Sequence, residues 1–197
     1  LGVWAKAYWP WMLIGLGVLL RAVQYVSGRS LWTDEASLAL NIVGRSYAEL
    51  LLPLDNDQVC PPGFLWLSRA AVDLFGSSEA ALRLPAFLFG ILSLPVFYVL
   101  ARRWTGRAEA ALALGVFAIS EHLVAYSAEL KQYSGDVLFS LLAFLLAGQR
   151  APGVRRWIVT GLLGAVAVWF SHAVVFVLAN LVVDVLYTFL DPRIRYE

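Results

Sequence analysis

The sequence has little of what a soluble, disulfide-bonded or nucleic-acid-binding protein needs. Only 15% of its 197 residues are charged, whereas soluble domains carry about 25%. Its 15 basic and 14 acidic residues nearly balance, which leaves no basic surface for nucleic acid. The one cysteine, Cys60, cannot form an internal disulfide and fits no zinc-ligand spacing. Hydrophobic residues make up 60% of the whole sequence, and this composition indicates a membrane protein.

Six hydrophobic segments approach the length of about 20 residues that a helix needs to cross a bilayer. The first holds a Trp-Pro-Trp triplet and no small-residue cleavage site follows it, so we expect it to stay in place rather than act as a signal peptide. One helix over 157–190 would be about 51 Å long, so a turn near Ser171–His172 is predicted to divide it. The predicted spans are residues 8–26, 80–100, 108–123, 133–147, 157–170 and 173–190.

Charges between the spans predict their orientation, because Lys and Arg are retained on the cytoplasmic side. With six spans the basic clusters share one side, while the first outer loop (28–79), the connection 127–134 and the Ser171–His172 turn face the other. Most acidic residues fall on that non-cytoplasmic face, where we expect the chemistry. The residues assigned to the cytoplasmic side are Lys6, Arg102, Arg103, Arg107, Arg150, Arg155, Arg156, Arg193 and Arg195.

Two helices of the first outer loop are expected to lie at the interface. Residues 61–75 are apolar but short, and Arg69 and Asp73 would each cost about 2.5–3.5 kcal/mol at the bilayer centre. Over residues 34–51 a polar face formed by Asn41, Arg45 and Glu49 opposes an apolar one. The predicted fold is all-α: a polytopic membrane protein of six transmembrane helices with these two juxtamembrane helices. We expect a single domain over 1–197, the N-terminal part of a longer protein that does not act alone.

Adjacent carboxylates follow the first span, at Asp34 and Glu35. In one interpretation they open a helix, with Thr33 or Asp34 as N-cap and acids favoured by the helix dipole. In the other, paired carboxylates at a water–lipid boundary serve as general base and as metal or substrate ligand. Spacing alone leaves both interpretations open.

Five motifs occur in an order that resembles the polyprenyl-phosphate-dependent glycosyltransferases of the GT-C superfamily. Within it the pattern looks like glycosyltransferase family 39, the protein O-mannosyltransferases and aminoarabinose transferases. The resemblance covers roughly residues 20–190, and His172 in the predicted turn fits it too. The motifs are LWTDEA at 31–36, PPGFL at 61–65, SEAALRLP at 78–85, YVLARR at 98–103 and YSAELKQY at 126–133.

The resemblance implies that Asp34 is the catalytic base, with Glu35 beside it. A base is needed because the acceptor hydroxyl loses its proton as it attacks the sugar C1, with inversion. The leaving lipid phosphate needs cations, and Arg83 and Lys131 are the candidates, unless they merely extend to the headgroups. Asp136 matches a second functional acid of the aminoarabinose transferases, or it caps the fourth span.

Other candidates each have an alternative explanation. Glu129 is a metal ligand or pairs with Lys131, and pairing is the preferred interpretation. Tyr126 and Tyr133 line the sugar site or belong to an aromatic belt, and His172 contacts substrate or is structural. Many relatives carry Glu-Lys or His before the double proline, and the Glu-Lys pair supplies a metal ligand. This chain has Val59-Cys60 there, so a divalent metal is in doubt, with Asp57 as the candidate substitute ligand. Two charges inside spans remain: Arg21, expected to extend to the headgroups, and Asp184, expected to pair with a span beyond this sequence.

The predicted activity is transfer of a sugar from a polyprenyl-phosphate donor to a hydroxyl of a protein, lipid or glycan acceptor. The expected location is a bacterial inner membrane, with the site on the periplasmic or extracellular face and membrane lipids, but no nucleic acid, as partners. Two alternatives need the spans but not Asp34: a carrier or polymerase subunit for lipid-linked glycans, and a non-catalytic membrane partner.

Overall fold

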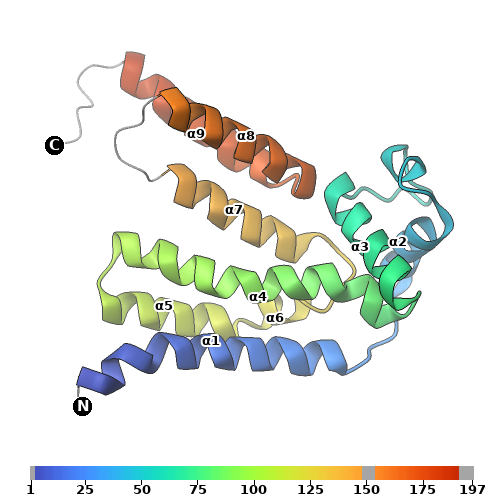
Figure 1. Cartoon of the computed structure of the whole chain (residues 1–197), viewed down its shortest axis with the longest axis horizontal. Helices are drawn as coiled ribbons and strands as arrows, with labels where there is room; N and C mark the ends of the chain where they lie inside the picture. The colour runs from blue at the N-terminus through green and yellow to red at the C-terminus, as the bar shows by residue number, and fades with distance from the viewer. Residues whose placement is uncertain (1–2, 148–153, 191–197) are drawn as a thin grey trace.

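The computed structural model describes residues 3–147 and 154–190, which form helices and no strand over those ranges (Figure 1). The all-α expectation is confirmed there. In chain order the elements are α1 (Val3–Val26), α2 (Thr33–Gly44), the 3-10 helix η1 (Glu49–Leu51), α3 (Pro62–Phe75), α4 (Glu79–Trp104), α5 (Arg107–Ile119), α6 (Glu121–Tyr126), α7 (Tyr133–Ala147), α8 (Val154–Phe170) and α9 (Val174–Leu190).

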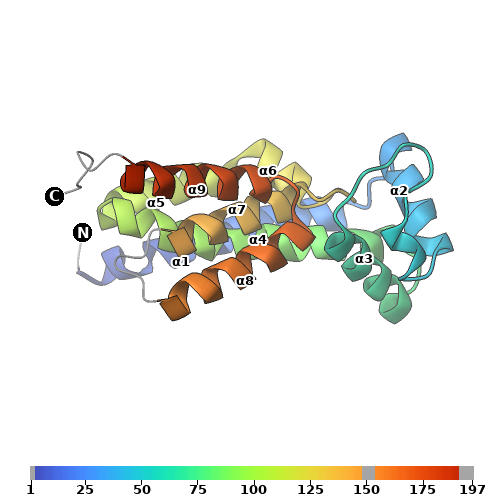
Figure 2. The same ribbon diagram turned by 90° about the horizontal axis from the view of Figure 1, so that it is seen from above.

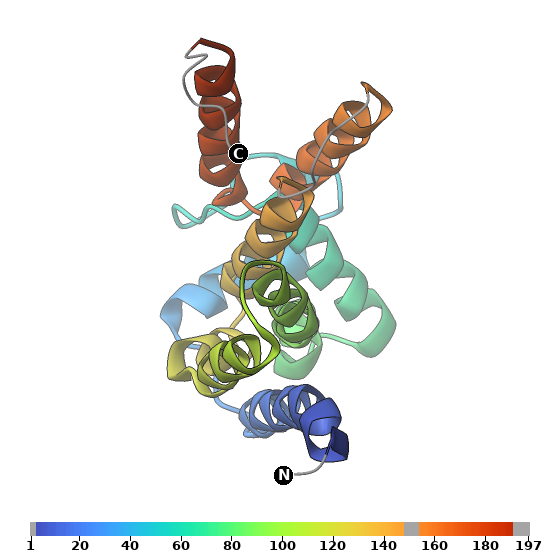
Figure 3. The same cartoon turned by 90° about the vertical axis from the view of Figure 1, so that its left-hand side faces the viewer.

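The longer helices lie side by side, with α4 packed against α1, α5 and α7. Viewed along the helices in Figure 3, α1 is followed by α4 and α5, then α7, then α8 and α9. Figures 1 and 2 place the α4–α5 connection and the start of α8 at one end of this bundle, and α2, α3 and the α8–α9 turn at the other. We call the latter the outer end. Arg102, Arg103 and Arg107 therefore lie away from the outer end, as the charge pattern predicts.

Two of the described helices are long and apolar enough to cross a bilayer: Tyr8–Val26 within α1, and α4. The segments Tyr133–Leu146 and Gly161–Phe170 are apolar but shorter. The turn predicted at Ser171–His172 separates α8 from α9, so this prediction is confirmed. The predicted count of six spans is not confirmed by helix length and composition.

The two helices expected in the first outer loop are present as α2 and α3, but the first is shorter than predicted. Residues 34–51 do not form one helix, because α2 ends at Gly44 and Arg45 is extended. Arg69 of α3 explains the end: its Nη1 donates to three carbonyls at the end of α2, at 2.7–3.2 Å, where a helix leaves carbonyls without partners. Asn41, expected on the polar face, is buried and bonded to the backbone of Asp55.

The third predicted span is interrupted, because α5 ends at Ile119 and α6 starts after Ser120. Arg21 supports this break. Its Nη1 donates to the carbonyl of Ala118 at 3.2 Å and to that of Gly17 at 3.1 Å, and a cation is favourable at a helix C-terminus. The expectation that Arg21 extends to the headgroups is wrong, since its side chain is fully buried between α1, α4 and α5.

A close approach to α4 brings the chain after the break back toward the outer end. A Cβ added at Gly90 would lie 2.6 Å from Cβ of Ser127 and 3.5 Å from the Arg21 side chain, closer than packed carbon atoms normally come. Glycine at position 90 therefore lets residues 127–132 run against α4, where they connect α6 to α7.

The structure does not describe the side chains of several residues on which the sequence predictions rest. They are basic residues used to predict orientation and one acid within a predicted span. They are Lys6, Arg150, Arg155, Arg156, Asp184, Arg193 and Arg195.

Candidate active site at the outer end

The predicted site residues come from four segments that meet at the outer end: the start of α2, the start of α4, residues 127–132 and the loop before α3. Trp32, rather than Thr33 or Asp34, is the N-cap of α2, so the predicted N-cap residue is wrong. The two acids do lie in the first turn, as the capping interpretation expects, and Glu35 accepts from the backbone N–H of Trp32 at 3.4 Å. The two carboxylates nevertheless have different side-chain partners.

Glu35 forms a buried connection between three segments. Its carboxylate accepts from Nε and Nη2 of Arg83 at 3.0 and 2.7 Å and from the backbone N–H of Leu130 at 2.5 Å. The two charged side chains are 1% and 5% exposed. Arg83 also donates to the carbonyl of Arg29. Because two-point bonding inside a protein fixes geometry, this pair holds α2, α4 and residues 127–132 in one arrangement.

Asp34 lies on the more accessible side of the same helix turn, with its side chain 43% exposed. Nζ of Lys131 lies 2.6 Å from Oδ2 of Asp34, and the Gln58 amide donates to Oδ1 at 2.9 Å. The Gln58 carbonyl in turn accepts from Lys131 at 3.0 Å. The three side chains thus form a closed triangle, in which the bond from Lys131 and then that from Gln58 lower the pKa of Asp34.

Glu129 does not pair with Lys131, contrary to the preferred sequence interpretation, because Lys131 bonds to Asp34 and Gln58 instead. Burial, followed by the nearby charge of Glu35, raises the pKa of the Glu129 carboxyl.

The other proposed metal ligand, Asp57, lies on the loop before α3 with a positive φ of 53°. Over the described ranges no three His, Cys, Asp or Glu side chains form a group able to hold a metal, so the two proposed ligands do not assemble a site.

Asp136 lies in the first turn of α7, and its side-chain bonds among the described residues are to the α8–α9 turn. It accepts from Oγ of Ser171 at 2.5 Å, and the same Oγ accepts from the backbone N–H of Val174. Asp136 therefore ties α7 to the α8–α9 turn that carries His172, and the prediction that it caps the fourth span is wrong. Tyr126 and Tyr133 contact each other, with ring centroids 4.8 Å apart, at the two ends of the segment that carries Lys131.

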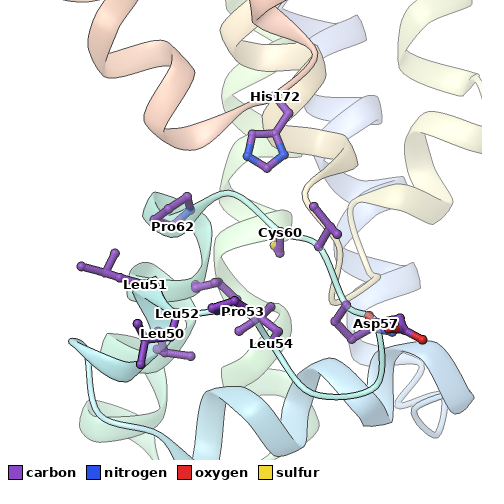
Figure 4. Close-up of a pocket in the computed structure, with 12 residues that line it drawn as sticks. Leu50, Leu51, Leu52, Pro53, Leu54, Asp57, Cys60, Pro62 and His172 are labelled. Atoms are coloured by element: carbon purple, nitrogen blue, oxygen red, sulfur yellow. The ribbon is translucent and has the colours of Figure 1, made fainter.

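A pocket of about 590 Å³, drawn in Figure 4, has Gln58 of the triangle in its lining. Figure 4 shows His172 pointing toward it from the α8–α9 turn, opposite the loop that carries Asp57 and Cys60. Gln58 lines the pocket and also bonds to Asp34 and Lys131, so pocket and triangle share a wall. Burial raises the pKa of the Cys60 thiol, which makes this cysteine a packing residue.

Two functional groups were missed by sequence reasoning: the Gln58 side chain and the Leu130 backbone N–H. Gln58 directly precedes the departure at Val59-Cys60, but no spacing rule connects it with Asp34. A backbone donor has no side-chain signature, so Leu130 could be found only from coordinates.

This arrangement combines a half-exposed carboxylate, held ionised, with a largely buried ammonium group and an open apolar pocket. A carboxylate of this kind is able to accept a proton from a hydroxyl, and a buried ammonium is able to bind an anionic leaving group. Both are requirements of group transfer from a phosphate.

The comparisons with known proteins point to the same chemistry. The model of the family described as dolichyl-phosphate-mannose-protein mannosyltransferase matches residues 59–195, a region that contains Arg83, Lys131, Asp136 and His172 and begins after Asp34. Neither the comparison with curated proteins nor that with solved structures gives a match. Because the matched region spans most of the sequence, the chain belongs to the dolichyl-phosphate-mannose-protein mannosyltransferase family, which consists of membrane glycosyltransferases of the GT-C type.

Proposed function

We propose that this protein transfers a sugar from a polyprenyl-phosphate donor to an acceptor hydroxyl on the non-cytoplasmic side of the membrane, with Asp34 as general base. The observation that carries the proposal is the pairing of Asp34 with Lys131 at 2.6 Å at the outer end. The family supplies the reaction class. The sugar is proposed to be mannose or a related hexose or pentose.

In the proposed step the acceptor oxygen forms a bond to C1 of the sugar while the bond from C1 to the phosphate oxygen breaks. The acceptor proton moves to the Asp34 carboxylate, and the electron pair of the broken bond leaves with the lipid phosphate. Inversion at C1 follows if attack and departure are in line.

Lys131 is the cation that we assign to the departing phosphate. Its ammonium bonds to Asp34 and Gln58, which are partners that an entering phosphate is able to replace. Removing Lys131 from Asp34 would bring the carboxyl pKa back toward its ordinary value, which makes it a better proton acceptor. Donor binding would therefore activate the base.

Glu35 and Arg83 are positioning residues in this proposal, not groups that touch the substrate. Both are almost fully buried, and their bonds are satisfied within the protein. His172, Tyr126 and Tyr133 remain candidates for sugar or acceptor contacts, and Asp136 positions His172 through Ser171.

The test of the proposed function is a transfer assay. Membranes containing the protein are supplied with radiolabelled mannosyl-phosphoryl-polyprenol and a hydroxyl acceptor, and label that leaves the lipid for the acceptor is counted. We expect transfer above that of membranes without the protein. A protein that binds the donor lipid without any transfer would instead be a carrier.

The pH profile of transfer tests the Asp34–Lys131 pair. In the wild type the lowered pKa keeps Asp34 ionised at pH values where an ordinary aspartate is already protonated. Activity is therefore lost only as the pH falls through the lowered pKa. Replacing Lys131 by methionine removes the largest cause of the lowering, so the acid limb of kcat/KM, measured on the residual activity, should move to higher pH. Lys131→Arg should leave the limb nearly in place. An unmoved limb in Lys131→Met would show that Asp34 is not the titrating base.

The side of the membrane on which the site lies is testable by cysteine labelling. In a Cys60→Ser background, Val59→Cys places a thiol on a side chain position that is 72% exposed at the outer end, and Trp104→Cys places one that is 75% exposed at the opposite end. A membrane-impermeant maleimide should label only the first in intact cells and both after permeabilisation. The reverse pattern would place Asp34 in the cytoplasm.

A further inference from the structure

We propose that the pocket beside the triangle binds an apolar side chain of an acceptor polypeptide, so that a neighbouring serine or threonine hydroxyl reaches Asp34. This inference rests on the proposed function and adds a specificity site to it. The pocket would select acceptor sequences by the residue near the hydroxyl.

The lining of the pocket suits an apolar group. Nine of its 12 lining residues are Leu, Val, Pro or Cys, and they come from η1, the following loop and α3. Burying a Leu- or Val-sized side chain there would remove its apolar surface from water, which favours binding. The volume of about 590 Å³ lies in the range of pockets that bury most of a small ligand.

The charges of the lining argue against the lipid phosphate as the occupant. The polar members are Asp57, Gln58 and His172, and the lining has no Lys or Arg. A phosphate beside Asp57 would lack a cation and meet a carboxylate. A neutral peptide side chain needs no cation and is not repelled by the Asp57 carboxylate.

The loop on the pocket rim offers backbone groups to an extended chain. Residues 58–61 are neither helix nor turn, and over the described ranges the backbone groups of Val59 and Cys60 make no hydrogen bond. Val59 is 72% exposed. Exposed loop backbone without hydrogen-bond partners, as at Val59, is able to receive a peptide as an added strand, with pockets reading its side chains.

Gln58 connects the pocket with the catalytic group. Its side chain lines the pocket and donates to Asp34 at 2.9 Å. A peptide that places one side chain in the pocket therefore holds the adjoining residues next to Asp34. That geometry makes the pocket a selector of acceptor sequence.

The experiment uses alanine peptides with a central serine in which leucine replaces alanine at one flanking position at a time. Binding of fluorescent versions to the full-length protein is measured by anisotropy, and transfer from mannosyl-phosphoryl-polyprenol is measured in parallel. We expect leucine at one position to tighten binding and raise kcat/KM by about tenfold or more, and aspartate there to weaken both.

Leu52→Trp fills the pocket from a lining position that is 61% exposed, and Leu40→Trp is the matched control at a position on α2 that is 71% exposed and outside the lining. Leu52→Trp should bring the ratio of kcat/KM for the leucine peptide to that for the all-alanine peptide close to one, whereas Leu40→Trp should keep the wild-type ratio. Binding indifferent to leucine would overturn the inference even where transfer is seen. Weaker binding of polyprenyl phosphate by Leu52→Trp, with peptide binding unchanged, would overturn it in favour of a donor-lipid pocket. Leucine-dependent binding without any transfer would support the pocket and contradict the proposed reaction.

Discussion

Asp34→Asn is expected to lower the rate of sugar transfer by about 10²- to 10⁴-fold, the usual contribution of a general base. Asparagine has the same shape, and its amide oxygen is still able to accept from Gln58, but it cannot take a proton from the acceptor. The loss should appear in kcat, with little change in the KM for the donor, because Asp34 acts on the acceptor proton.

The free energy of unfolding of the Asp34→Asn protein should fall by about 1–3 kcal/mol, less than for a fully buried pair. The Asp34 side chain is 43% exposed, but its partner Lys131 is only 8% exposed and keeps neutral oxygens alone as acceptors. Asp55→Asn is the matched control, since Asp55 is a 74% exposed acid of the same loop paired with Arg45, and it should keep the wild-type rate within about twofold. Full activity in Asp34→Asn would reject the proposed base and favour a carrier or partner role.

Breaking the Glu35–Arg83 pair is expected to lower the free energy of unfolding by about 3–5 kcal/mol, because each single change leaves one buried charge without its partner. The pair is 1% and 5% exposed, so water cannot replace the lost bonds. Glu35→Gln and Arg83→Met are the two single variants. Unfolding in detergent, titrated with denaturant and followed by circular dichroism, measures the change.

The double variant separates pairing from packing. Glu35→Gln with Arg83→Met removes both charges, so its loss should be smaller than the sum of the two single losses, by about 0.5–3 kcal/mol of coupling. Arg69 serves as the control, because it is a cation of α3 that caps α2. The losses of stability caused by Arg69→Met and Glu35→Gln should simply add. Additive losses for Glu35 and Arg83 would show that their contact is incidental.

The helices were largely predictable because each carries its own periodic signal. The predicted segment 133–147 coincides with α7, and the turn at Ser171–His172 follows from the length limit of a helix. The predictions failed where a distant group decided the outcome. Helix α2 stops early because Arg69 takes its carbonyls, and the predicted span 108–123 breaks beside Arg21.

For the site, the residue types and their order after the apolar segments are readable from the sequence. The sequence does not show which charged side chains form ion pairs. Lys131 was expected beside Glu129, two residues away, yet it bonds to Asp34, 97 positions earlier in the chain. Local spacing favours neighbours, but burial leaves each charge only the partner that packing brings within reach. The packing of distant segments therefore makes Asp34 accessible and encloses its neighbour Glu35, and no local pattern distinguishes the two carboxylates.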